Sequence, residues 1–212
     1  MADTLNGKDI RALFGSIKNL ILANRDRLTE LDSAIGDGDL GITMSRGFEE
    51  ADRALGAIEE ADPGKLLMSA GMTIAKTAPS TMGTLVATGF MKGGKAVSGK
   101  DALSLGDIAL FFEAFAQGIM DRGKAKPGEK TILDTLVPAA EALRRASSES
   151  EKLDIALSVA YDAALQGAEN TKNMKARHGR PAYYGDASVG KEDPGAAVGV
   201  IILEGFVKYA VS

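Results

Sequence analysis

The 212-residue sequence has no cysteine and a single histidine, His178. The absence of cysteine excludes a disulfide framework, a thiolate metal site and a cysteine nucleophile. With one histidine there is no His-rich metal site and little room for a Ser-His-Asp triad. A metal site in this chain must therefore use oxygen ligands, which suit hard cations such as Mg²⁺ or Ca²⁺. We expect His178 itself to be an exposed loop residue.

An excess of positive charge and long apolar runs are also lacking. Lys and Arg number 25 against 29 Asp and Glu, a net charge of −4, which argues against nucleic-acid binding as the main role. No run approaches the ~18 apolar residues of a membrane span, and the N-terminus has no apolar signal core. We therefore expect a cytoplasmic protein with neither nucleic-acid nor membrane partners.

Glycine, in contrast, is abundant. It supplies 25 of the 212 residues, well above the usual ~7%, and it clusters in 36–41, 83–99, 118–128 and 179–199. Such a chain can pack helices closely and leave glycine-rich loops that approach a ligand.

Apolar residues recur at spacings of three and four along most of the chain, which is typical of helices. Asp62-Pro63 and Asp193-Pro194 each combine an N-cap with proline at the first helical position, and Ser104 with Asp107 resembles a capping box. No stretch alternates with period two, so we expect no strand. The expected helices span 8–29, 42–60, 82–97, 131–147 and 151–175, with three more opening near Pro63, Ser104 and Pro194.

These eight helices predict one all-α domain over residues 1–212. Pro138 should kink the helix 131–147 or lie near its start. The polar stretches 121–130 and 177–194 are long for loops in a helical bundle, and loops of that length are often functional.

The segment 31–48, LDSAIGDGDLGITMSRGF, carries three carboxylates within eight residues: Asp32, Asp37 and Asp39. Its glycines leave the backbone free to curl, so that the carboxylates can converge. Converging carboxylates repel one another and persist only with a compensating cation. The segment predicts a divalent-metal site, and the alternative is a solvated acidic turn.

Two other glycine motifs match nucleotide-binding loops only superficially. GDGDLG at 36–41 has the G-x-G-x-x-G spacing but follows an expected helix rather than a strand. GFMKGGKA at 89–96 lacks the Ser or Thr that closes a P-loop, because Ala96 stands in that position. We reject both interpretations.

Two further segments are candidate phosphate contacts. APSTMGT at 78–84 stands just before a helix, whose N-terminus can hold an anion; simple capping is the alternative. Arg180 can bind a polyphosphate bidentately, or it is an isolated surface arginine. Together with the acidic segment they predict a Mg²⁺-nucleotide site. We find no convincing nucleophile or general base, so a partner would have to hold the acceptor.

Three spaced motifs then resemble a known family over essentially the whole chain. They are Asp32-x4-Asp37-Gly38-Asp39-x-Gly41, RGKAKPGEKT at 122–131 and GRPAYYGDASVGKEDPGA at 179–196. They look like the nucleotide-binding L subunit of dihydroxyacetone kinase. The resemblance implies an eight-helix antiparallel barrel with a nucleotide pocket at one end. It also implies that the three aspartates hold two Mg²⁺ ions against the phosphates of ADP or ATP.

The resemblance further assigns a set of nucleotide-binding residues. Residues 40–43 and the Thr81-Met82 pair would line the phosphates. Gly123 and Ile132 would border the base, and Arg180 with residues 193–195 would close the pocket. The set is Leu40, Gly41, Ile42, Thr43, Thr81, Met82, Gly123, Ile132, Arg180, Asp193, Pro194 and Gly195. In the family, a separate K subunit binds the ketone through its own histidine, which agrees with the lack of catalytic groups here. The phosphoryl donor is either ATP or an ADP coenzyme recharged by a phosphotransferase-system subunit.

The sequence departs from the family pattern in three places. Leu40 replaces a usual histidine, Thr43 replaces a frequent asparagine, and the segment 79–83, Pro-Ser-Thr-Met-Gly, replaces Gly-Gly-Ala-Ser-Gly. The departures leave open the donor and the ketose, which is dihydroxyacetone or a C4 ketose such as erythrulose. The oligomeric state is also open, and a homodimer is one option. Two alternative functions are a regulatory module that senses nucleotide state and an acyl-kinase component.

Overall fold

The structure, a computed structural model, describes residues 3–211 and is almost entirely helical within them, which confirms the all-α prediction. Two 3₁₀ segments, η1 (Thr171–Asn173) and η2 (Arg180–Ser188), follow α8. The α-helices are α1 (Gly7–Ala23), α2 (Arg25–Ile35), α3 (Leu40–Ala57), α4 (Pro63–Thr77), α5 (Thr81–Ala96), α6 (Leu105–Gly123), α7 (Leu133–Ser148), α8 (Leu153–Asn170) and α9 (Pro194–Val211).

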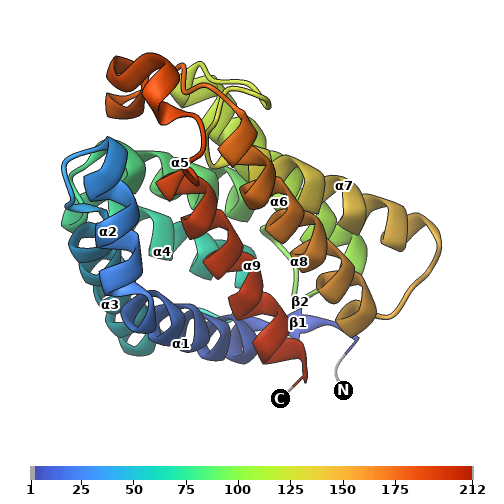
Figure 1. Ribbon diagram of the computed structural model, residues 1–212. Coiled ribbons are helices and arrows are strands. Elements are labelled where there is room, and N and C mark those ends of the chain that lie inside the picture. The colour runs from blue at the N-terminus through green and yellow to red at the C-terminus, as the bar shows by residue number, and fades with distance from the viewer. Residues whose placement is uncertain (1–2, 212) are drawn as a thin grey trace.

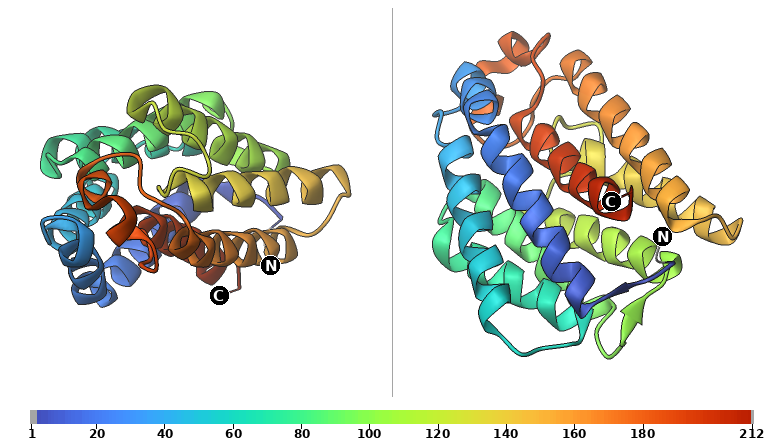
Figure 2. Two further views of the ribbon diagram at one scale, coloured as in Figure 1. Left: turned by 45° about the horizontal axis from the view of Figure 1, so that its top comes forward. Right: turned by 90° about the horizontal axis from the view of Figure 1, so that it is seen from below.

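Eight of these helices form a closed ring. Each helix from α3 to α9 packs against the next one in the chain, and α1 closes the ring by packing against both α3 and α9. Figure 1 shows α9 beside α8, and the right panel of Figure 2 shows α1 and α9 lying side by side. The remaining helix, α2, packs outside the ring against α3. The expected eight-helix barrel is therefore present.

The connections alternate between the two ends of the ring. Those at 36–39, 78–80, 124–132 and 171–193 lie at one end, and those at 58–62, 97–104 and 149–152 lie at the other. Chain segments far apart in sequence therefore meet at the first end, at the top of Figure 1.

In the part of the chain that the structure describes, no helix has the length and apolar content that crossing a membrane requires.

All seven phenylalanines form one connected cluster inside the ring. Helix α5 approaches this cluster through glycine: a Cβ atom would lie 2.4 Å from the Phe115 ring at Gly89, and 2.6 Å from the Phe111 ring at Gly93. The P-loop-like glycines thus serve helix packing, which explains why that motif is not a phosphate loop.

Most helix starts agree with the cap signals. Asp62 accepts the N–H groups of Gly64 and Lys65, and the Ser104–Asp107 capping box is complete. Pro138 lies in the second turn of α7, close to the start as one of the two expectations had it. The helix expected over 151–175 ends earlier, at Asn170, where η1 takes over.

Two predictions about the elements are wrong. The helix expected over 8–29 is two helices, because Asn24 leaves helical geometry (φ −101°, ψ 9°) and its side chain donates to the carbonyl of Leu20. A short antiparallel pair also exists, β1 (Leu5–Asn6) with β2 (Ala102–Leu103). Strands of two residues are too short to show an alternating pattern.

Candidate functional site

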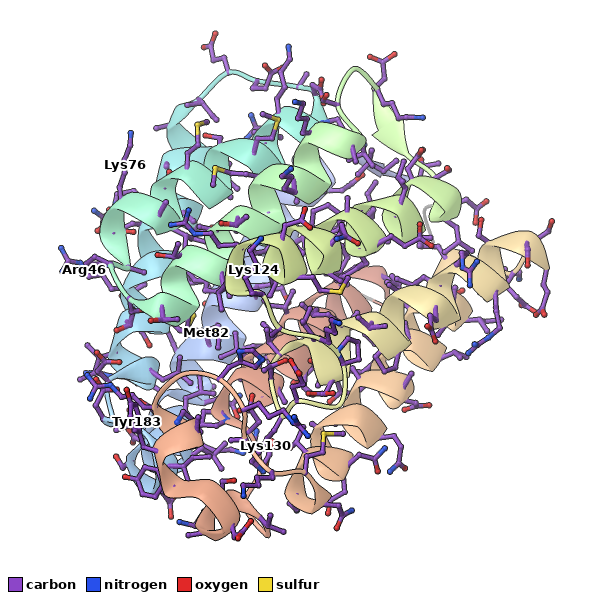
Figure 3. The ribbon with its side chains drawn as sticks, turned by 90° about the horizontal axis from the view of Figure 1, so that it is seen from above. Arg46, Lys76, Met82, Lys124, Lys130 and Tyr183 are labelled. Atoms are coloured by element: carbon purple, nitrogen blue, oxygen red, sulfur yellow. The ribbon has the colours of Figure 1, made fainter. Side chains whose placement is uncertain are left out.

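The end of the ring where the longer connections meet holds a cavity of about 990 Å³. That volume is at the upper end of the range for small-molecule and cofactor sites. Its lining comes from all four connections at this end and from the adjoining turns of α2 to α6 and α9. Figure 3 looks onto this end, with Met82 and Lys130 toward the centre of the view and Tyr183 nearer its edge.

The three predicted acidic residues converge at one side of this cavity. Asp32 lies on α2, and Asp37 and Asp39 lie in the connection to α3. One carboxylate oxygen from each lies within 4.8 Å of the others. The close turn requires glycine at position 36, because a Cβ atom there would lie 2.1 Å from Asp32 Oδ1.

The local hydrogen bonds leave carboxylate oxygens available to a cation. Asp39 is the N-cap residue of α3, yet its side chain makes no capping hydrogen bond. The side chain of Asp32 caps the start of α3 instead: its Oδ2 accepts the N–H groups of Asp39 (3.0 Å) and Leu40 (3.2 Å). Asp39 and Asp37 therefore present carboxylates that the helix start does not use, an all-oxygen donor set that fits Mg²⁺.

The electrostatics of the cluster also favour a cation. Desolvation and then the charges of Asp37 and Asp32 raise the pKa of Asp39, while Arg180 opposes the shift. Arg180 Nη2 lies 2.8 Å from Asp37 Oδ2. Three like charges with one arginine beside them remain under-compensated, and a divalent ion would remove the repulsion.

The wall beside the acidic cluster is the N-terminus of α5. Ser80 caps this helix by accepting the N–H of Gly83 at 3.0 Å. Capping does not prevent anion binding at this helix, because the first few N–H groups of a helix have no intrahelical partner and Ser80 accepts only one of them. Thr81 and Met82, in the first turn, line the cavity. The site therefore places a helix N-terminus and the carboxylates in the same cavity, an arrangement that suits a metal-bound phosphate.

The other end of the cavity is largely apolar. Leu85 of α5, Ile119 and Gly123 of α6, Ala125 and Ile132 line it. These residues provide a surface suited to a flat, weakly polar ring, while the acidic cluster and the α5 N-terminus provide the polar end. The cavity thus has the polarity of a nucleotide site.

A buried polar cluster lies in the cavity wall, and sequence reasoning found its member Asp193 but missed Lys130. Lys130 is 2% exposed, and its Nζ donates to the carbonyl of Thr171 at 2.5 Å and to that of Lys191. Asp193 caps α9 by accepting the N–H of Ala196 at 2.8 Å, and burial raises its pKa to about 7. Burial also lowers the pKa of Lys130. The cluster ties the 124–132 connection to the start of α9.

A segment that we call the strap, residues 177–192, covers one side of the cavity and is red-orange at the top of Figure 1. Its residues 178–181 line the cavity. His178 Nε2 lies 2.5 Å from Glu129 Oε2, and the imidazole is half-buried. His178 lies in a loop as expected, but the expectation that it is exposed is wrong, because its imidazole contacts an acidic partner 49 residues away.

The structure brings most of the expected nucleotide-binding residues together. The cavity is lined by Leu40, Thr81, Met82, Gly123, Ile132, Arg180, Asp193, Pro194 and Gly195 as well as the three aspartates. The structure does not place Gly41, Ile42 and Thr43 among the lining residues. Gly41 faces α2, where a Cβ atom would lie 2.1 Å from the carbonyl oxygen of Arg25, and Ile42 is 53% exposed.

Comparisons with known proteins identify the family to which the chain is similar. Residues 34–208 match the family model described as the DAK2 domain. The chain is 37% identical over 177 residues to the "PEP-dependent dihydroxyacetone kinase, ADP-binding subunit DhaL" of Escherichia coli, covering 84% of each chain. It is 34% identical over 189 residues to the corresponding subunit of kinase 1 of Listeria innocua, covering 89% of each.

A solved structure shares the fold. The dihydroxyacetone kinase of C. freundii, in complex with AMP-PNP and Mg²⁺, superimposes with a TM-score of 0.70 at 22% identity. The superposition covers 94% of this chain and 33% of that one, so this chain corresponds to about a third of the larger kinase.

Proposed function

Because the chain belongs to the DAK2 domain family, we propose that it is the nucleotide-binding subunit of a multi-component ketose kinase. In this role the whole chain serves as one Mg²⁺-nucleotide domain, and a separate K subunit holds the ketose. The observation that carries the proposal is the convergence of three carboxylates, each with an oxygen within 4.8 Å of the others, beside the α5 N-terminus in one large cavity. The E. coli relative is an ADP-binding subunit, which supports the choice of ligand.

Each part of the cavity then has a role. Asp32, Asp37 and Asp39 hold Mg²⁺, with two ions expected, and the ions supply charge neutralisation on the phosphoryl oxygens. Thr81 and Met82 present the α5 N-terminus to the phosphates.

The remaining lining residues close the site around the nucleotide. Gly123 and Ile132 border the base at the apolar end. Arg180 adds positive charge beside Asp37, and the turn from Asp193 to Gly195 forms the wall at the start of α9.

The acceptor has to come from another subunit. Among the lining residues that the structure describes, the imidazole of His178 is hydrogen-bonded to Glu129, and the ammonium of Lys130 donates hydrogen bonds to two backbone carbonyls. Neither group is free to activate a ketose hydroxyl. The proposal therefore requires a ketose-binding K subunit, and a phosphotransferase-system subunit as well if ADP stays bound and is recharged in place.

The nucleotide content of the purified protein tests the donor. The protein is isolated in Mg²⁺ buffer, desalted and acid-quenched, and the released nucleotide is identified by chromatography. Near-stoichiometric ADP supports a coenzyme that is recharged in place. A site that fills reversibly with Mg-ATP supports exchange at each turnover.

Calorimetry tests the site itself. We expect Asp37→Ala to abolish Mg-nucleotide binding without loss of helicity. A matched control is Asp52→Ala, which removes an α3 carboxylate paired with Lys18 outside the cavity. Undiminished binding by Asp37→Ala would refute the assignment. Turnover of dihydroxyacetone or erythrulose on addition of a K subunit supports the kinase role, whereas nucleotide-dependent partner binding without turnover supports a sensing module instead.

A further inference from the structure

Two hydrogen bonds to Glu129 fix the strap to the 124–132 connection, and a third steadies the Glu129 carboxylate within that connection. His178 Nε2 lies 2.5 Å from Glu129 Oε2, and the same oxygen accepts the N–H of Lys126 at 2.8 Å. The N–H of Arg177 donates to the Glu129 carbonyl at 3.3 Å. The side chains of His178 and Glu129 are 33% and 25% exposed, so the pair is sheltered enough to be stronger than a fully solvated ion pair.

The strap then crosses to the acidic side of the cavity. Gly179 turns the backbone with a positive φ of 62°, and Arg180 reaches Asp37 with its guanidinium at 2.8 Å. The Arg180 side chain is 67% exposed, so little packing holds it in place. Its position over the carboxylates therefore depends on how the strap backbone is held, by residues 178–179 directly before it and by the hydrogen bond from Lys191 Nζ to the Ala34 carbonyl (2.9 Å) at the far end of the strap.

The contact of Arg180 with Asp37 cannot hold the strap by itself. Asp37 is also a candidate metal ligand, so a cation and the guanidinium compete for its oxygens. Glu129 has no part in the acidic cluster. The His178–Glu129 contact therefore holds the strap independently of any ion bound by the aspartates.

We propose that the His178–Glu129 pair is a positioning element that holds Arg180 and the strap over the bound nucleotide and so limits the rate at which the nucleotide leaves. The inference rests on the proposed function and concerns the residence time of the nucleotide in that same site. The pair acts through Arg180 and does not itself touch the reacting atoms. In agreement, the hydrogen bond from His178, followed by that from the Lys126 N–H, holds the pKa of the Glu129 carboxyl below its usual range.

The test is the dissociation rate of a fluorescent ADP analogue. Protein loaded with the analogue and Mg²⁺ is mixed with excess ADP in a stopped-flow instrument. We expect His178→Ala and Glu129→Ala each to raise the dissociation rate about five- to tenfold, the size typical of one partly exposed hydrogen bond of ordinary net strength. His178→Lys places a hydrogen-bond donor opposite Glu129, and it should restore most of the retention.

Two further measurements separate positioning from a general loss of stability. Asp186→Ala removes a strap ion pair with Lys175 at 2.8 Å, outside the cavity, and it should leave the dissociation rate unchanged. In an Arg180→Ala background, His178→Ala should add little, because both changes remove the same restraint. Thermal melting of every variant accompanies the kinetics.

The outcomes are distinct. A wild-type protein that fails to bind the analogue with Mg²⁺ overturns the proposed function and this inference with it. A wild-type protein that binds, with His178→Ala dissociating at the wild-type rate, overturns the inference alone. Full additivity of His178→Ala and Arg180→Ala, or an Asp186→Ala effect as large as that of His178→Ala, also overturns it.

Discussion

Replacing Asp39 with asparagine should stabilise the metal-free protein while abolishing Mg²⁺-dependent nucleotide binding. Asp39 is the informative position because its carboxylate does not cap α3, so its removal leaves the helix start intact. Asp32 accepts two N–H groups at that start, and Asp37 is paired with Arg180. Asparagine at position 39 thus removes a charge with little other structural change.

The magnitude follows from Coulomb's law. Two unit charges 4.8 Å apart, the upper limit between the ligand oxygens, repel by about 1 kcal/mol in water and by about 3.5 kcal/mol at an effective dielectric constant of 20. Asp39 faces two such charges, but it is exposed and Arg180 offsets part of the repulsion. After discounting for solvent screening, we expect a gain of about 1–2 kcal/mol in the free energy of unfolding. For a chain of this size that corresponds to about 2–8 °C in Tm.

The sign of the pH dependence gives a second check. The folded protein raises the pKa of Asp39 above its ordinary value of 3.8, so it binds this proton more tightly than the unfolded chain does. The stability of the metal-free wild type should therefore fall as pH rises from about 4 through the raised pKa, and Asp39→Asn should lack this component.

Thermal melts in a chelator, at low and high salt, measure the effect, and calorimetry with Mg-ADP measures the loss of binding. Asp37→Asn should gain less, because it leaves Arg180 without its partner. A lower Tm for Asp39→Asn in chelator would refute the reasoning. It would mean that repulsion from Asp32 and Asp37 does not make the Asp39 carboxylate destabilising in the metal-free protein.

Three other predictions follow from single contacts. Burial raises the pKa of Asp193 to about 7, so stability in chelator should fall as pH rises from about 4 to 7, and Asp193→Asn should flatten that dependence in melts at pH 5 and 8. Gly41→Ala places a Cβ atom 2.1 Å from an α2 carbonyl and should cost about 2–3 kcal/mol and weaken Mg-ADP binding; an equal cost for Gly56→Ala, where the Cβ meets nothing within 4 Å, would contradict this. Ser104→Ala removes a capping box and should cost about 1 kcal/mol in a denaturant melt with nucleotide affinity unchanged.

The features that could be predicted from sequence depend on residues close together in the chain. Cap signals at Asp62, Ser104 and Asp193 act within one helical turn, so the sequence displays both partners at once. The acidic cluster is local in the same sense, since Asp32 and Asp39 are seven residues apart. Helix periodicity reports burial along one face, and it therefore located most of the barrel helices to within about three residues, although it extended two of them past their ends at Ala23 and Asn170.

The same periodicity concealed the break at Asn24. Leu20 and Ile21 before it and Leu28 after it are all buried, so the apolar pattern continues although the helix does not. The break lets α2 leave the ring and place Asp32 over the connection to α3. Asparagine is tolerated in helices and favoured at their ends, and the pattern alone does not distinguish the two situations.

The residues that escaped prediction have partners far away in the chain. Lys130 reads as a solvated lysine in a polar loop, and it is buried because two carbonyls, 41 and 61 residues further on, converge on its ammonium group. His178 has its partner 49 residues earlier. Both contacts join the 124–132 connection to the 171–193 connection, and these meet only because alternate connections of the ring lie at one end. The acidic cluster can therefore be recognised from its own segment, whereas the contacts that join these two connections follow from the closure of the barrel.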